Sequence, residues 1–409
     1  MKNLFLLFLT IIFTGSPLLA QKKDFTYNFY GFVRGDLFYN TRANVAPVDG
    51  NFYMYPLDKE LDANGKDLNA TPNGSFYTFT TRFGLDLSGP MLGTAQTSAK
   101  IETDFGGFSS STTMLRIRQA YVALDWDKSQ LLIGQTWHPM FGSVFPDMLN
   151  LSTGAPFQPF NRSPMFRLRH KVERVEFLAA TIWQLQYQSM GPNGSSEDYI
   201  KNSCIPEIYI GADYAPKNGW LIGAGARLIS LKPRTSATWN NNIYKVDERI
   251  TTLSYEAHLK YTGKKVTIAA KSFLTSATEN MSMLSGYGVS SVNSETGEQK
   301  YTPYQHSTSW LNITYGSKWK PGIFVGYTKN LGTKDALVSA DKLYGRGLNM
   351  DQLYMVNPSF SYNLPHWRLG VEYCLSTAYY GTTDLENGKV KDTHSVTNHR
   401  ILGLLVYLF

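Results

Sequence analysis

Two pairs of arginines have the spacing best suited to chemistry in this 409-residue chain. Arg116 and Arg118 are two positions apart, as are Arg167 and Arg169, so both members of a pair face the same side of an extended strand. Paired guanidiniums offer planar and permanently charged donors to a carboxylate. The pattern predicts a surface that attracts anions rather than a site that carries out a reaction.

Further charged residues fall on the same face of neighbouring alternating segments. The basic ones are Arg34, Arg82 and Lys100, and the acidic ones include Glu102 and Asp104. Charged patches that line a narrow aqueous passage bias which sign of ion passes through it. Together with the two arginine pairs, these residues are the predicted selectivity residues. The alternative interpretation is that they are ordinary water-facing side chains.

The sequence offers little support for catalysis or metal binding. His306 and Ser307 are neighbours in an expected strand, so they point to opposite faces and cannot form the Ser–His pair of an outer-membrane phospholipase. The seven histidines show no metal-ligand spacing, and the segment 62–67 reads as an ordinary polar loop. We expect no cofactor, and no disulfide between Cys204 and Cys374.

The elements that must position these residues are strands with strict alternation. Segments 25–39 and 76–88 carry apolar residues on one face and charged residues on the other, as a wall between lipid and water requires. Further strands are predicted at about 93–105, 114–126, 130–138, 164–171, 174–189, 206–215, 220–231, 249–262, 265–274, 306–319, 323–331, 352–362, 366–379 and 397–409, roughly sixteen in all.

Connections and composition lead to the same fold class. Short turns alternate with long loops, and aromatic residues gather at the strand ends on the short-turn side: Trp126, Trp220, Tyr261, Trp319, Trp367 and Phe409. Charged residues make up only 17% and aromatic residues 14%. We predict an all-β protein, a transmembrane antiparallel β-barrel with short periplasmic turns and long extracellular loops. Its basic residues are spread rather than clustered, so we expect no nucleic acid partner.

The two ends of the chain indicate export to the bacterial outer membrane. Residues 1–20 have one lysine, an apolar run and a small residue at the break, which predicts a signal peptide, and residues 21–409 would form the barrel. The last strand ends on Phe409, as the closing strand of such barrels does. We expect this strand to be recognised by the barrel-assembly machinery, and the barrel to contact outer-membrane lipid.

The segment 139–163 is unusually apolar for a loop. It contains several prolines together with Phe141, Phe157 and Phe160. An apolar loop of this length is expected to fold back into the barrel, where these three phenylalanines would set the width of the passage. The alternative is a surface patch that binds a partner.

Several motifs resemble the DcaP-like porin family. They are Gly31-Phe32-Val33-Arg34-Gly35-Asp36, the segments 81–89, 100–105 and 115–122, and Leu132-Ile133-Gly134-Gln135-Thr136-Trp137. The resemblance is strongest over about 29–170. It implies a trimeric, sixteen-stranded channel for small anionic solutes such as dicarboxylates, with Arg34, Arg82, Arg116, Arg118, Arg167 and Arg169 at the family's arginine positions. Only residues 21–24 precede the first strand, which leaves no room for the N-terminal coiled coil that some members carry.

The sequence therefore predicts an outer-membrane porin of a Gram-negative bacterium, which is not an enzyme. Small hydrophilic, anionic solutes would diffuse through it passively, and a homotrimer is the expected assembly. The alternative is a barrel that acts as a surface binding or adhesion protein through its long extracellular loops.

Overall fold

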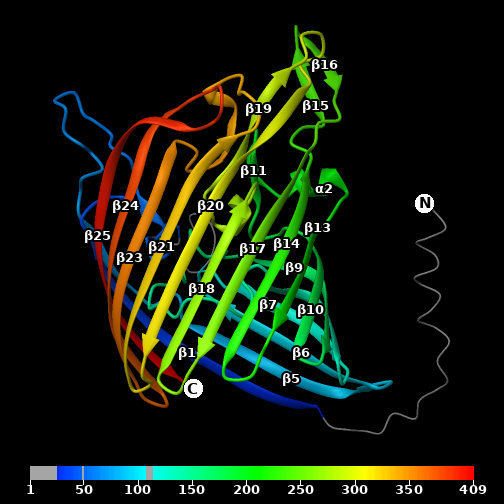
Figure 1. The fold of residues 1–409 in the computed structure, drawn as a ribbon, viewed down its shortest axis with the longest axis vertical. Helices are drawn as coiled ribbons and strands as arrows, with labels where there is room; N and C mark the ends of the chain where they lie inside the picture. Colours follow the sequence, from blue (N-terminus) through cyan, green and yellow to red (C-terminus); the bar gives the residue numbers. More distant parts are fainter. Residues whose placement is uncertain (1–24, 48–49, 107–113) are drawn as a thin grey trace.

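The computed structural model describes residues 25–47, 50–106 and 114–409. In this part of the chain, sixteen antiparallel strands close into a barrel, which confirms the predicted fold class (Figure 1). The predicted signal peptide lies outside the described residues. Within them, no helix is both long and apolar enough to cross a membrane.

The strands of the wall follow one another around the ring in chain order. They are β1 (Thr26–Asn40), β5 (Arg82–Leu92), β6 (Ala95–Asp104), β7 (Arg116–Asp125), β8 (Ser129–Trp137), β9 (Arg162–Val172), β10 (Val175–Ile182), β13 (Glu207–Tyr214), β14 (Trp220–Leu231), β17 (Ile250–Thr262), β18 (Val266–Thr275), β20 (Gln299–Tyr315), β21 (Trp319–Thr333), β23 (Met350–Asn363), β24 (Trp367–Thr383) and β25 (Val390–Leu408). A short strand, β4 (Asn73–Tyr77), precedes β5 and also pairs with β1.

The ring closes where β1 meets β25. The two strands pair in register from Phe32 opposite Leu408 to Asn40 opposite Arg400. Beyond this ladder, the backbones of Gly31 and Phe409 exchange two hydrogen bonds of 3.0 and 3.1 Å. The first residues of β1, Thr26 to Phe32, pair with β5. The first strand therefore pairs with both the next strand of the wall and the last one.

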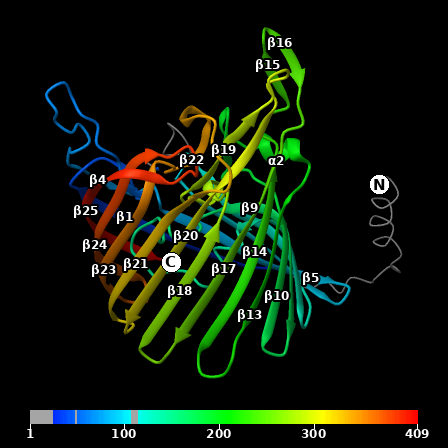
Figure 2. The ribbon, with the colours of Figure 1, turned by 45° about the horizontal axis from the view of Figure 1, so that its top comes forward.

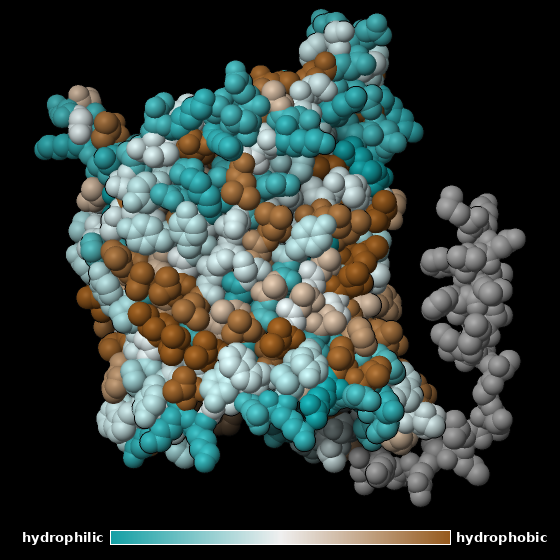
Figure 3. Space-filling view, viewed as in Figure 1, coloured by the Kyte–Doolittle hydropathy of each residue, from teal (hydrophilic) through white to brown (hydrophobic). Residues whose placement is uncertain are grey.

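Alternation along each strand separates a lipid-facing side from an inner side. On β17, Thr252, Ser254 and Glu256 are buried, whereas Leu253 and Tyr255 between them are exposed. Figure 3 shows the result on one face of the barrel, as a band of apolar residues across the middle between hydrophilic ends. A band of this kind matches the hydrocarbon layer of a membrane.

Aromatic residues line the short-turn end of this band. Trp220 packs against Tyr261 with ring centroids 4.9 Å apart, Trp319 against Tyr362 at 4.2 Å, and Trp367 against Tyr407 at 4.8 Å. Indole and phenol rings favour the boundary between hydrocarbon and water, so these neighbouring pairs fit the interfacial girdle predicted from the sequence.

The connections sort by length, with tight turns at one end of the barrel and long loops at the other (Figure 1). The long loops contain β2 (Asn44–Val45), β3 (Tyr55–Pro56), β11 (Ser189–Gly191), β12 (Gly194–Ser196), α2 (Asp198–Ser203), β15 (Ser236–Trp239), β16 (Asn242–Lys245), η1 (Glu279–Met281), β19 (Ser285–Val292), η2 (Ala340–Lys342) and β22 (Leu343–Arg346). In Figure 2 the hairpin of β15 and β16 stands clear above the barrel.

Four predicted strands differ from the observed ones by six residues or more at one end. The strand predicted at 397–409 begins at Val390, and the one predicted at 76–88 is interrupted after Tyr77 and resumes at Arg82. The strand predicted at 174–189 ends at Ile182, because the side chain of Gln184 exchanges two hydrogen bonds of 2.8 Å with Ser189 and holds the chain in a turn. The strand predicted from 306 begins at Gln299, because its first residues pair with β19 in the long loop before it.

Unboiled protein in a detergent gel should migrate differently from boiled protein, because a closed barrel leaves no strand edge from which detergent can open the sheet. The circular dichroism spectrum should be dominated by strand. The two measurements check the fold together, and a spectrum with substantial helix would contradict it.

Candidate solute pathway inside the barrel

The segment from His138 to Asn161 lies across the interior of the barrel. It leaves the wall after β8 and returns at the start of β9. Met140, Phe141, Phe157 and Phe160 are all buried within the barrel, and the ring of Phe157 packs 6.1 Å from that of Phe324 on β21. A loop that touches the opposite wall divides the interior.

A half-buried ion-pair triad anchors the middle of this loop. Arg368 on β24 donates to Asp147 Oδ1 at 2.9 Å, and Lys320 on β21 bonds the other carboxylate oxygen. Burial by itself would raise the pKa of Asp147, but the two cations hold it below its usual range. The loop carboxylate therefore remains charged and attached to the wall at neutral pH.

A second anchor uses the backbone of the loop. The N–H groups of Leu149 and Asn150 donate to Glu372 on β24, at 2.7 and 3.3 Å. Arg34 on β1 donates to the carbonyl oxygen of Leu149 at 2.7 Å. Because backbone donors of the loop tip bind β24 and a backbone acceptor binds β1, these contacts hold the tip at one position between the two strands.

Two other loops join the segment in one apolar cluster, which we call the lumen cluster. The first contributes Phe52 to Tyr55, and the second contributes Met281, Met283 and Leu284. Phe52 packs edge-on to Phe160 with ring centroids 4.8 Å apart, and Phe160 N donates to Met281 O at 2.7 Å. The sequence analysis did not predict that these two loops fold inward.

The three phenylalanines predicted to set the width of the passage all belong to the lumen cluster. Phe157 is completely buried, and Phe141 is stacked on Trp137 with centroids 4.1 Å apart. Their rings contact other side chains rather than water. These phenylalanines therefore do not line a passage directly, and they would affect its width by holding the loop in position.

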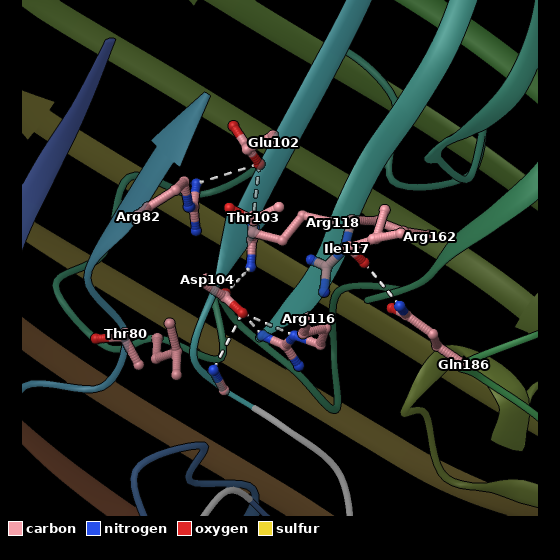
Figure 4. A network of polar contacts seen from close by, with 12 residues as sticks. Thr80, Arg82, Glu102, Thr103, Asp104, Arg116, Ile117, Arg118, Arg162 and Gln186 are labelled. Atoms are coloured by element: carbon pink, nitrogen blue, oxygen red, sulfur yellow. Dashed lines mark hydrogen bonds and ion pairs between the residues drawn. The ribbon is translucent and has the colours of Figure 1, made fainter. Parts of the chain in front are cut away.

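Five of the predicted selectivity residues form a single network on β5, β6 and β7 (Figure 4). Asp104 accepts two hydrogen bonds from Arg116, of 2.9 and 2.8 Å, and one of 2.7 Å from Arg118. Arg118 also donates to Glu102 at 2.8 Å, and Arg82 lies 3.7 Å from the same carboxylate. The arginines are thus held in fixed positions by the two acids between them.

Arg162 lies beside this network and was not predicted. Its side chain is completely buried, and its guanidinium lies 4.6 Å from the ring of Trp137. It donates to the hydroxyl of Tyr187 at 2.7 Å, while its Nε and Nη1 have no hydrogen-bond partner among the described residues. A single arginine at the end of a loop carries no spacing signal in the sequence, so only the fold brings it to the network.

The remaining predicted residues lie elsewhere in the interior. Arg34 pairs with Asp36 at 2.6 Å, and Lys100 pairs with Asp86 at 2.6 Å and lies over the ring of Tyr30. Arg167 and Arg169 face a separate cavity of about 220 Å³ on β9 and the strands after it. The fold therefore distributes the predicted set over several positions rather than one ring.

The comparisons with known proteins bear on the fold. No family model and no curated protein matches the chain. Among solved structures, the outer membrane channel DcaP of Acinetobacter baumannii is 18% identical with a TM-score of 0.64, and 96% of this chain aligns with 99% of that chain. OmpT, an outer membrane protein of Vibrio cholerae, is 11% identical in a trimer form, with a TM-score of 0.55 and coverage of 95% and 100%. The chain therefore has the fold of the channel DcaP, which confirms at the level of fold the resemblance found in the sequence.

Proposed function

We propose that this protein is an outer-membrane porin of a Gram-negative bacterium, through which small hydrophilic, anionic solutes diffuse passively. The observation that carries the proposal is the loop from His138 to Asn161, which is anchored across the interior of a closed barrel. Such a loop narrows an aqueous passage while the wall around it stays intact. The proposal includes no reaction and no cofactor.

The charge balance beside the loop supports the preference for anions. The four guanidiniums of Arg82, Arg116, Arg118 and Arg162 surround the two carboxylates of Glu102 and Asp104, which gives this region a net charge of +2. Little water and salt fit beside charges in a narrow passage, so their field is poorly screened there. The side chain of Arg82 is 20% exposed whereas the other members are buried, so we place the solute path beside Arg82, within the field of the group.

Location and assembly belong to the same proposal. The apolar band contacts outer-membrane lipid, residues 1–20 are removed on export, and the barrel-assembly machinery recognises the strand that ends at Phe409. A homotrimer is the proposed assembly. The trimer form of the Vibrio cholerae OmpT structure, which has the same fold, supports it.

Recording current across a planar lipid bilayer tests the proposal. Purified protein should produce discrete current steps, and the reversal potential in a KCl gradient should indicate that chloride passes more readily than potassium. Insertion without current steps would contradict the channel, and a preference for potassium would contradict the proposed selectivity alone.

The second candidate function is surface binding through the long loops. The hairpin of β15 and β16 favours it, because the hairpin projects from the barrel (Figure 2) and exposes Ile243 in β16. Binding residues are disproportionately found on loops that a rigid scaffold presents to solvent. The bilayer recording separates the two functions, since a binding barrel with a filled interior would not conduct.

A further inference from the structure

The cavity beside Arg167 and Arg169 combines both signs of charge. It lies between the start of the inward loop, at Pro139 to Ser143, and the inner faces of β9, β10, β13 and β17. Its volume of about 220 Å³ has room for roughly seven water molecules at ~30 Å³ each. A small organic solute would therefore fit.

The basic side of the cavity retains unused hydrogen-bonding capacity. Arg167 donates to Gln130 at 3.2 Å, and Arg169 approaches Glu176 only to 3.6 Å. The Nε atoms of both arginines are buried and have no hydrogen-bond partner among the described residues. Such donors are costly to leave unpaired. Both side chains also line the cavity, and that of Arg169 is 36% exposed, so its guanidinium is within reach of a solute carboxylate.

The acidic side lies on the next two strands. Glu176 on β10 and Asp213 on β13 are directly opposite in register, and their side chains are 38% and 28% exposed, so both carboxylates are open to the cavity. Asp213 also bonds His258 at 2.9 Å. The two bonded side chains lie over Gly223, where a Cβ would be 2.3 Å from each of them. Only glycine at this position leaves room for the hydrogen bond between Asp213 and His258.

The spacing of the two sides determines what the cavity can bind. Neighbouring strands are about 4.8 Å apart, which places Asp213 on β13 about 10 Å from the arginines of β9. Glu176 on β10 lies between them, 3.6 Å from Arg169. A solute between them needs a carboxylate toward the arginines and a cation, a few ångströms away, toward Glu176 and Asp213. A dicarboxylate would direct its second charge at the acids, and a diamine would direct one at the arginines.

We propose that this cavity binds the zwitterionic form of small α-amino acids, with the carboxylate on Arg167 and Arg169 and the ammonium group on Glu176 and Asp213. The proposal rests on the proposed function, because the solute must reach the cavity through the lumen. It adds a second class of solute to the anions attracted by the network around Arg118.

L-serine is the probe, with two analogues that each lack one charge. Ethanolamine has no carboxylate, and 3-hydroxypropionate has no ammonium group. In planar bilayers with the full-length protein, L-serine should reduce the ion current at a concentration about tenfold lower than either analogue, since each single-charge analogue gives up one of the two ion pairs. Titration calorimetry of the protein in detergent should give the same order.

Variants of both sides test the assignment. Arg167→Gln together with Arg169→Gln, and separately Glu176→Gln, should each weaken the effect of L-serine about tenfold. Lys329→Gln is the matched control, because its ion pair with Asp351 lies on β21 and β23, outside the cavity lining. That variant should respond to L-serine like the unchanged protein. Migration of the unboiled protein in a gel verifies that each variant folds.

Equal responses to the three compounds, or an unchanged response of both variants, would overturn the inference and leave a cavity that holds only water. A different result would contradict the proposed function: no ion current through the protein when no solute has been added. Calorimetry then still reports whether L-serine binds, because it does not depend on conductance.

Discussion

Deleting residues 145–160 should raise the single-channel conductance several-fold. The deletion removes the part of the loop that carries Phe157 and Phe160 into the lumen cluster and Asp147 onto the far wall. The ladders between the wall strands do not include this segment, so the barrel should still close. The measurement is the size of the current steps in a planar bilayer.

A deletion of similar kind outside the barrel serves as the control. Removing residues 239–242, where β15 turns into β16, should leave the conductance unchanged, since this hairpin projects away from the lumen (Figure 2). If the loop deletion also leaves the conductance unchanged, the loop is not in the path of ions. The surface-binding function would then gain support.

Replacing Arg116 and Arg118 together by Ala should move the reversal potential toward cation preference and weaken block by dicarboxylates. The substitution lowers the net charge of the region from +2 to zero, because Glu102 and Asp104 remain beside Arg82 and Arg162. It also leaves buried carboxylates without their main partners. The loss of a partner from a buried ion pair costs about 3–5 kcal/mol, so the variant should also unfold at a lower temperature.

A variant with four substitutions separates the effect on ion selectivity from the effect on thermal stability. Adding Glu102→Gln and Asp104→Asn to the double substitution removes both signs of charge, so the region keeps a net charge of +2 from Arg82 and Arg162. We expect its reversal potential to return toward that of the unchanged protein, with part of the lost thermal stability recovered. A double variant that keeps the original reversal potential would mean that these arginines do not control selectivity.

The wall of the barrel was predictable because every strand must present apolar residues to lipid on one face and polar residues to water on the other. Leu253 and Tyr255 on one face of β17, with Ser254 and Glu256 on the other, give a period of two that few other structures produce. Each predicted strand corresponds to an observed one except that at 76–88, which is divided between β4 and β5, and the other errors lie at ends such as Ile182 and Gln299. At those positions, side-chain hydrogen bonds or a partner strand in a loop decide the boundary.

The interior was less predictable because its contacts join residues that are distant in the sequence. The pairing of β6 with β7 shifts by one residue between Glu102 and Thr103, which leaves Arg118 as the extra residue beside Glu102. Alternation cannot reveal such a bulge. Nor can it reveal that Arg162 joins Arg118, or that Asp104 accepts bonds from both Arg116 and Arg118.

The junction of β1 with β25 has a consequence for how the protein folds. The partners Phe32 and Leu408 stand near opposite ends of the chain, so this ladder has the greatest sequence separation in the ring. Contacts of this kind form slowly, because the whole intervening chain must be ordered first. Until they form, the facing edges of β1 and β25 have unpaired backbone groups, each costing several kcal/mol in lipid. A half-built ring is thus unstable in the bilayer, and insertion and closure of this protein should occur together as one cooperative event.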